Sequence, residues 1–155
     1  MEKHHRLPLK NYRGITRATF TICVKDKKCL FTDSVIVDKF LKYLDEAIKK
    51  YACKNLVYVF MPDHLHIVLE GNCADSDVWK SIVLFKQKTG FWLRKNKPGF
   101  HWQKDFFDYL HRKEDDFKKH ITYILNNPTR KGLAADWQDY QFKGSLDYPL
   151  EEILD

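Results

Sequence analysis

The sequence has little that would indicate a membrane, secreted or multidomain protein. No apolar run approaches the roughly 18 residues that a spanning helix needs. The first residues, MEKHHRLPLKNYRG, lack the apolar segment of a secretory signal, so we expect a cytoplasmic protein without a membrane partner. Repeats, low-complexity tracts and Gly/Ser linkers are also missing. We therefore expect one domain over residues 1–155, with a basic leader (1–14), a core (about 15–133) and a C-terminal tail (134–155).

Cysteine is present, but not in a pattern that would build a framework. Cys23, Cys29, Cys53 and Cys73 are scattered without a CxxC pair. Disulfide frameworks belong to short secreted chains, and cysteine zinc sites use closely spaced pairs. We expect four reduced, partly buried thiols and no cysteine zinc site.

Basic residues outnumber acidic ones, with 27 Lys and Arg against 21 Asp and Glu, a net charge of +6 and a pI of about 9.0. Aromatic residues make up 15% of the chain. Basic grooves with interspersed aromatic rings suit single-stranded nucleic acid, because its exposed bases stack on rings. The composition favours a nucleic-acid partner, although the alternative that most rings belong to the core stays open.

The hydrophobic patterns alternate between strand and helix. Strands are expected over 18–25, 55–61, 64–71 and, with imperfect alternation, 102–111; helices are expected over 34–51, over about 77–95 and from near 113 to 127. Pro62-Asp63 predicts a tight turn that joins the second and third strands as a hairpin. The order β-α-β-β-α-β is the split βαβ plan of ferredoxin-like and RRM-like folds. We expect an α+β fold, an antiparallel sheet with helices packed on it and one appended C-terminal helix.

The third expected strand begins with two histidines separated by a leucine. Side chains two apart on a strand point to the same face, so His64 and His66 project side by side. Two imidazoles in that position can chelate one metal ion. The alternative is that the two histidines have only a structural role and bind no metal. This spacing arises readily by chance in a chain with 7 histidines.

The third expected helix carries a second candidate group. At about 100° per residue, His120, Tyr123 and Asn127 fall together beside its apolar stripe and can reach toward the sheet. The alternative is that they edge the core, as Tyr and Asn often do. The helix expected over 77–95 is strongly basic outside its buried side. Its cations are candidate DNA contacts or, alternatively, a solvated face: Lys86, Lys88, Arg94 and Lys95.

Several stretches together resemble one family. YVFMPDHLHIVLEG (58–71) resembles the histidine-hydrophobic-histidine strand of the single-tyrosine (HUH) transposases of small insertion sequences. HWQKDFFDYLHRKEDDFKKHITYILNNPTRKGL (101–133) resembles the C-terminal half of their REP-associated tyrosine transposase relatives, and so do ATFTICVKDKKCLF (18–31) and IVLFKQKTG (82–90). The resemblance covers roughly residues 12 to 135. Beyond it, the tail WQDYQFKGSLDY is only a loose match to the aromatic-Ser-Ser segment of the family.

The resemblance implies a role for each candidate residue. Tyr123 matches the nucleophile of the family, His64 and His66 match two metal-binding histidines, and Asn127 matches the third ligand. His120 matches a histidine often found one turn before the tyrosine, and no role is assigned to it. The metal implied is Mg²⁺ or Mn²⁺, and nothing in the sequence selects between them.

The implied activity is metal-dependent cleavage and rejoining of single-stranded DNA through a 5′-phosphotyrosine intermediate. The implied partner is single-stranded or hairpin DNA, which would associate the protein with the nucleoid. Insertion-sequence relatives are homodimers and REP-associated ones act as monomers, so both states stay open. Three alternatives also remain: a phosphodiesterase in which the histidine-bound metal activates water, an inactive hairpin-binding module, and a basic α+β domain with structural histidines.

Overall fold

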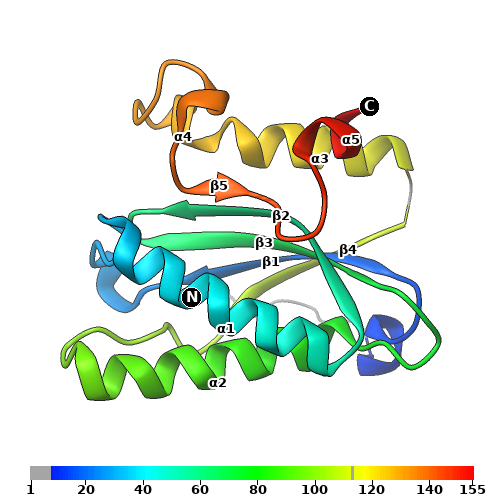
Figure 1. The fold of residues 1–155 in the computed structure, drawn as a ribbon, viewed down its shortest axis with the longest axis horizontal. Coiled ribbons are helices and arrows are strands. Elements are labelled where there is room, and N and C mark those ends of the chain that lie inside the picture. Colours follow the sequence, from blue (N-terminus) through cyan, green and yellow to red (C-terminus); the bar gives the residue numbers. More distant parts are fainter. Residues whose placement is uncertain (1–7, 113) are drawn as a thin grey trace.

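An antiparallel sheet separates the helices into two layers (Figure 1). The computed structural model describes residues 8–112 and 114–155; the first seven residues of the expected leader and Lys113, near which the third helix was expected to begin, lie outside the described residues. The strands are β1 (Arg17–Cys23), β2 (Cys53–Met61), β3 (His64–Gly71), β4 (Phe107–His111) and β5 (Lys143–Gly144). Their order is β4-β1-β3-β2-β5, and every pairing is antiparallel.

The helices α1 (Ser34–Lys50) and α2 (Val78–Asn96) cover one face of the sheet, and α3 (Glu114–Leu125) covers the other (Figure 1). Short helices follow at α4 (Asn127–Arg130) and α5 (Leu150–Leu154), with 3₁₀ turns η1 (Leu9–Tyr12), η2 (Lys25–Lys27) and η3 (Trp137–Asp139). This arrangement confirms the α+β fold with a split βαβ plan. No helix within the described residues is long and apolar enough to cross a membrane.

Both long helices begin at an aspartate that caps their first turn. The Asp33 carboxylate accepts hydrogen bonds from the backbone N–H groups of Val35 and Ile36, and Asp77 accepts one from that of Lys80. Such caps satisfy backbone donors that have no partner inside the helix, at roughly 1 kcal/mol each. They fix both helix starts at the positions expected from the sequence.

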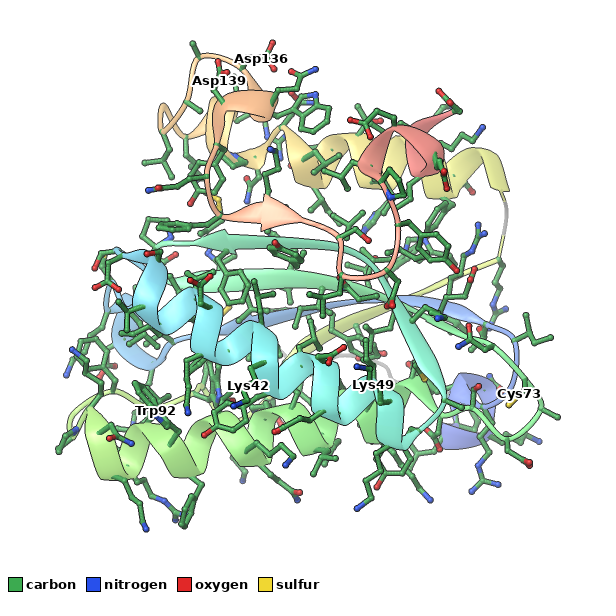
Figure 2. The ribbon with its side chains drawn as sticks, in the orientation of Figure 1. Lys42, Lys49, Cys73, Trp92, Asp136 and Asp139 are labelled. Carbon is green, nitrogen blue, oxygen red and sulfur yellow. The ribbon has the colours of Figure 1, made fainter. Side chains whose placement is uncertain are left out.

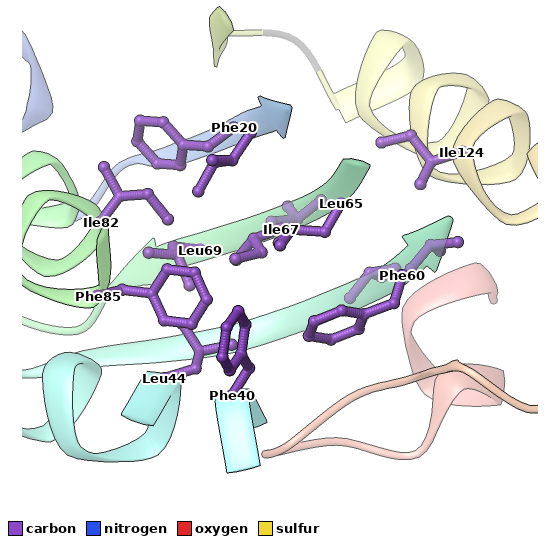
Figure 3. Packing of buried hydrophobic residues seen from close by; sticks show 14 of the residues in the cluster. Phe20, Phe40, Leu44, Phe60, Leu65, Ile67, Leu69, Ile82, Phe85 and Ile124 are labelled. Atoms are coloured by element: carbon purple, nitrogen blue, oxygen red, sulfur yellow. The ribbon is translucent and has the colours of Figure 1, made fainter. Parts of the chain in front are cut away.

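The β2–β3 hairpin forms around Pro62-Asp63, as expected, and its alternation decides which side chains face which layer. Leu65, Ile67 and Leu69 are fully buried and pack toward α1 and α2 with Phe40 and Phe85 (Figure 3). The intervening residues of β3, among them both candidate histidines, point to the opposite face. The hairpin therefore supplies the core with one set of residues and the α3 side with the other.

Two expected elements are shorter than the sequence pattern indicated. The strand expected over 102–111 is regular only over Phe107–His111, and Trp102 makes one isolated bridge to Val24. The carbonyls of Gln103 and Lys104 accept hydrogen bonds from the Lys86 ammonium at 2.9 Å, and thus from a side chain rather than a neighbouring strand.

The helix expected to end at Asn127-Pro128 ends two residues earlier, and a separate turn follows. Asn126 keeps helical backbone angles (φ −84°, ψ −1°), and α4 then begins at Asn127. Pro128 is tolerated there because the N–H groups of the first helical turn have no acceptor within the helix. A proline at this position, which has no N–H, therefore loses no hydrogen bond. The proline starts the next turn instead of ending the helix.

The tail completes the sheet on the α3 side of the molecule. β5 pairs with Tyr58 and Val59 of β2, and the N–H of Phe60 donates to the carbonyl of Phe142 at 2.8 Å. The Tyr140 hydroxyl donates to the Phe60 carbonyl at 2.6 Å, and burial raises the pKa of Tyr140 to about 12. The sequence pattern did not predict this strand.

Candidate active site

A pocket of about 440 Å³ opens between the α3-facing side of the sheet and the α3–α4 segment. Its walls come from β1, β3, β4, α3 and α4, and their residues are Thr19, Thr21, His64, His66, Phe107, Asp108, Tyr109, His120, Tyr123, Ile124, Asn127, Arg130 and Lys131. The two groups singled out in the sequence are about sixty residues apart in the chain. In the fold they line one cavity.

The histidine pair occupies the β3 wall of the pocket. The two rings lie 5.0 Å apart, nearly perpendicular to each other. Nδ1 of His64 lies 2.7 Å from a carboxylate oxygen of Asp63, and Nδ1 of His66 lies 2.8 Å from the Thr21 hydroxyl. Thr21 is the residue paired with His66 across β1 and β3, so its side chain shares that face of the sheet. Engaging both Nδ1 atoms leaves Nε2 of each ring as the nitrogen able to bind a ligand.

His66 is neutral at physiological pH. Burial, followed by the proximity of His64, His120 and Arg130, lowers the pKa of His66 to about 3. A metal ligand must be deprotonated. The buried, crowded face of β3 thus keeps the His66 lone pair available.

The α3–α4 segment places three polar side chains on the opposite wall. Tyr123, Asn127 and Arg130 follow one another at spacings of four and three residues, which bring them to one side of the helical path. The Arg130 guanidinium lies 3.7 Å from the centre of the Tyr123 ring, and its Nη2 donates to the Asn127 amide oxygen at 3.2 Å. Tyr123 is 64% exposed, so a chain as large as DNA can reach its hydroxyl.

The Asn127 amide connects the two walls. Its NH₂ group faces Nε2 of His66 at 3.2 Å, while its oxygen is held by Arg130. Coordination of a metal through that oxygen would require the amide to turn over and release Arg130, since only the carbonyl oxygen carries a lone pair for a metal.

His64, His66 and Asn127 are the residues of this pocket that could hold a divalent ion. No group of three or more His, Cys, Asp or Glu side chains within 8–112 and 114–155 is placed to hold a metal. The pocket instead combines two imidazoles with one amide. Mg²⁺ typically keeps several waters and completes its shell with substrate phosphates, and Mn²⁺ accepts imidazole more readily.

One protein-family model matches most of this chain. The model of the IS200-like transposase family matches residues 16–127 of the chain. The chain belongs to the IS200-like transposase family. This membership confirms the resemblance found in the sequence, and the matched range contains both histidines, the tyrosine and Asn127.

The individual relatives point to one branch of the IS200-like family. A REP-associated tyrosine transposase of Escherichia coli K12 is 31% identical over 88 residues, which span 55% of this chain and 50% of that protein. A Haemophilus influenzae protein provisionally given the same designation is 25% identical over 135 residues, 76% of this chain and 74% of that protein. A solved REP-associated tyrosine transposase, bound to a REP hairpin, matches with a TM-score of 0.73 at 19% identity over 92% of this chain and 82% of its own. That likeness shows a shared fold.

Some residues of the pocket were not anticipated from the sequence. Arg130 was missed because its contact with Tyr123 depends on the helical turn after Asn126. Tyr109 stacks on His120 at 5.3 Å, and His111, outside the pocket lining, packs edge-on against His120 at 4.7 Å. The strand alternation of β4 was the available signal, because Tyr109 and Thr19 are paired across β1 and β4 and so share a face.

The cations expected to contact DNA lie elsewhere. Lys86, Lys88, Arg94 and Lys95 belong to α2, on the face of the sheet opposite the pocket (Figure 1). Lys86 is already engaged with the carbonyls of Gln103 and Lys104. The structure therefore does not bring these four residues together with the histidines and Tyr123.

Proposed function

We propose that this protein is a metal-dependent, single-tyrosine DNA transposase that cleaves and rejoins single-stranded DNA through a 5′-phosphotyrosine intermediate. The observation that carries the proposal is the pocket that collects Tyr123 with His64, His66 and Asn127. A tyrosine on a separate helix next to two imidazoles is what covalent phosphoryl transfer needs: an oxygen nucleophile beside groups that can hold an ion on the phosphate.

The reaction itself is an exchange of phosphodiester bonds. The Tyr123 hydroxyl oxygen attacks the scissile phosphorus, the bond to the 3′ oxygen breaks, and the tyrosine proton leaves while the 3′ oxygen gains one to become a hydroxyl. The DNA remains attached through a 5′-phosphotyrosyl bond, which a 3′-hydroxyl can attack in reverse. The protein thereby conserves the bond for strand transfer, whereas a nuclease loses it to water.

The remaining residues have supporting tasks. Arg130 fixes the Tyr123 ring and places a permanent positive charge beside the site of attack. Asp63 and Thr21 orient the imidazoles of His64 and His66. A divalent ion held by the two imidazoles and the Asn127 oxygen would supply Lewis-acid polarisation of the scissile phosphate.

The DNA substrate is proposed to carry a hairpin. This rests on the family, and on the solved REP-associated relative of the same fold, which is bound to a REP hairpin. A DNA substrate also agrees with the cytoplasmic, nucleoid-associated location expected from the sequence. The monomeric and homodimeric states both remain compatible with this proposal.

Two other candidates make different demands on the pocket. A phosphodiesterase that activates water would not need Tyr123, yet this exposed tyrosine shares the cavity with both histidines. An inactive hairpin-binding module would not need the imidazole lone pairs that burial keeps available on His66. Both observations favour the transposase.

The test is the covalent intermediate. The protein would be incubated with Mg²⁺ or Mn²⁺ and a library of hairpin-bearing single strands, and protein–DNA adducts scored on denaturing gels. We expect an adduct that Tyr123→Phe abolishes while hairpin binding stays nearly unchanged, because only the hydroxyl is lost. Tyr109→Phe, an alteration in the same pocket, is the matched control and should retain the adduct. An adduct that survives Tyr123→Phe would contradict the assignment, and its loss in Tyr109→Phe would point to Tyr109.

A further inference from the structure

A second open groove lies on α2, away from the active pocket. Its volume is about 540 Å³, and it is lined by Lys86, Gln87, Gly90, Phe91, Arg94, His101 and Trp102. The proposed chemistry uses none of these side chains. They come from the middle of α2 and from the segment that leads from α2 toward β4.

An exposed aromatic ring forms one wall of this groove. Phe91 is 52% exposed, although it sits on a helix with a large buried side. The Lys95 ammonium lies 4.8 Å from the centre of its ring, and the Arg94 guanidinium lies 5.6 Å from it. The ring is thus an exposed apolar surface with two cations held over it.

A second aromatic side chain is held rigidly on the other side. The indole N–H of Trp102 donates to the Thr89 hydroxyl at 2.8 Å, and this hydroxyl donates to the Phe85 carbonyl one helical turn earlier. The two bonds fix the orientation of the indole against α2. The groove therefore has a defined shape.

Glycine at position 90 leaves the floor of the groove open. A Cβ placed there would meet its nearest neighbour, Cδ1 of Trp102, at 3.7 Å, an ordinary contact distance. Packing therefore does not require glycine at this position, where glycine weakens the helix relative to alanine. Because Gly90 has no side chain, the space between Phe91 and Trp102 stays open.

The chain segment that forms the groove carries charge of one sign. Residues 78–104 contain seven Lys or Arg and no Asp or Glu. Six of the acidic residues instead lie in the tail over 133–155, where Lys143 is the sole Lys or Arg. The neighbourhood of the groove attracts a polyanion, and no carboxylate within this stretch opposes it.

We propose that this groove binds an unpaired nucleotide of the DNA substrate, with its base stacked on Phe91 and its phosphates near Arg94 and Lys95. The assignment rests on the proposed function, which supplies a single-stranded partner. An aromatic ring with cations beside it is the combination that binds single strands, because an unpaired base offers its face to the ring and its phosphate to the charge. A base within a duplex is stacked between its neighbours, so neither of its two faces is open to the Phe91 ring.

One chain segment borders both sites. His101 and Trp102 line the groove, and Phe107, Asp108 and Tyr109 line the active pocket. A single strand of DNA that runs along this segment can place one nucleotide in the groove and a phosphodiester near Tyr123. The groove would then set the distance between the anchored base and the cleavage point.

The test measures binding with single bases removed. The probe is a labelled hairpin with a single-stranded flank, in a series in which successive flank positions are abasic; affinity is measured by fluorescence anisotropy without added metal. For the complete probe, Phe91→Ala should weaken binding about tenfold, the scale of one base–aromatic stack. For one abasic position, that loss should disappear, because the base that Phe91 would contact is already missing.

A second variant and two controls separate binding from folding. Gly90→Ala should weaken binding several-fold while the unfolding temperature stays the same or rises, because its methyl group enters the groove and favours the helix. Val35→Ala, at an exposed apolar position of α1, and Lys42→Ala, an exposed lysine of the same helical layer (Figure 2), should change neither property.

The outcomes distinguish this inference from the proposed function. If Phe91→Ala has no effect, or weakens every abasic probe equally, the groove does not bind a base, even when the wild-type protein forms its tyrosine adduct. Equal losses on a blunt duplex would overturn the preference for an unpaired nucleotide. If the abasic dependence appears but the wild-type protein forms no adduct with metal, the groove stands as a binding site and the transposase proposal falls.

Discussion

At the scale of single residues, several polar side chains in and next to the active pocket have distinct hydrogen-bond partners. Asp63 and Thr21 each engage one Nδ1 atom of the histidine pair, so each ring presents its Nε2 atom. Asn127 and Arg130 share a hydrogen bond that occupies the amide oxygen. A metal would compete with Arg130 for that oxygen, and the released guanidinium would remain beside Tyr123, where it can meet a phosphate.

A ligand series tests the metal assignment. His64→Ala and His66→Ala should each remove cleavage without unfolding the protein, because both side chains line a pocket and not the core. Asn127→Ala should raise the metal concentration needed for half-maximal adduct formation more gently, since water can replace a neutral carbonyl oxygen. Asn127→Asp should retain metal binding because a carboxylate is a preferred Mg²⁺ ligand. An unchanged metal requirement in Asn127→Ala would show that Asn127 is not a ligand, and Asp63 would be the first replacement to examine.

A second residue-scale prediction concerns acid stability. Burial, followed by the proximity of His120 and Arg17, lowers the pKa of His111 to about 4 from its usual 6.5. Between these pH values the unfolded chain binds a proton at His111 that the folded chain does not, so stability falls as the pH falls, by up to about 1.4 kcal/mol per pH unit for this group. His111→Gln should flatten the decrease in unfolding free energy between pH 6.5 and 4, measured by urea denaturation. A profile parallel to that of the wild-type protein would contradict this.

At the scale of elements, one buried side chain of β2 adds to the backbone and side-chain hydrogen bonds that hold the tail. The Asn55 amide donates to the carbonyls of Val57 and Val68 at 3.0 and 3.1 Å, and its oxygen accepts from the N–H of Leu146 at 3.0 Å. Asn55 also lies where the β2–β3 register shifts. It thus satisfies backbone groups that an irregular strand leaves without a partner.

Removing that side chain should loosen the tail before the sheet. Asn55→Ala would leave two buried carbonyls and one N–H without these bonds, at a cost of roughly 2 to 4 kcal/mol in unfolding free energy. We expect faster proteolysis within residues 137–148 under native conditions, measured by timed digestion and mass spectrometry. Asp45→Ala, which removes an exposed ion pair with Lys49 on α1, is the control and should change neither quantity measurably. Equal proteolysis of the two variants would mean that Asn55 does not hold the tail.

Some features of these elements could be predicted from the sequence, and others could not. The β2–β3 hairpin and the extents of α1 and α2 were predictable because a tight turn and the periodicity of apolar residues are local signals. The pairing of His64 with His66 followed from strand alternation alone. β5 is two residues long and depends on Asn55 and Phe60, which are distant in sequence, so no local pattern reveals it. The position of Arg130 likewise depends on the helical turn that resumes after Asn126.

At the scale of the whole molecule, the active pocket and the basic helix α2 occupy different faces of the sheet. The active pocket lies on the α3 side of the sheet, whereas the cations of α2 lie on the other side (Figure 1). A DNA substrate that uses both can follow residues 101–109, which border the groove and the pocket. A flexible single strand can bend in this way at far lower cost than a stiff duplex.

Salt dependence tests this arrangement. The protein should bind single-stranded or hairpin DNA more tightly than plain duplex, and the affinity should fall as salt rises, because each neutralised phosphate releases counterions. Replacing Arg94 and Lys95 together by alanine should reduce the slope of log affinity against log salt by about 1.4, which is two contacts at roughly 0.7 each for single strands. Lys86 is unsuitable for this test, since its loss would also free the carbonyls of Gln103 and Lys104.

The matched control for that measurement is the double replacement of Lys42 and Lys49 by alanine, at two exposed positions of α1 next to α2 (Figure 2). It removes the same formal charge from the same helical layer, so a general loss of positive charge would reduce both slopes equally. A reduction confined to the Arg94 and Lys95 variant would identify α2 as a surface that contacts phosphates. Equal reductions would mean that α2 contributes only to the overall field. A flat salt dependence, or equal affinity for duplex and single strand, would contradict the single-stranded substrate itself.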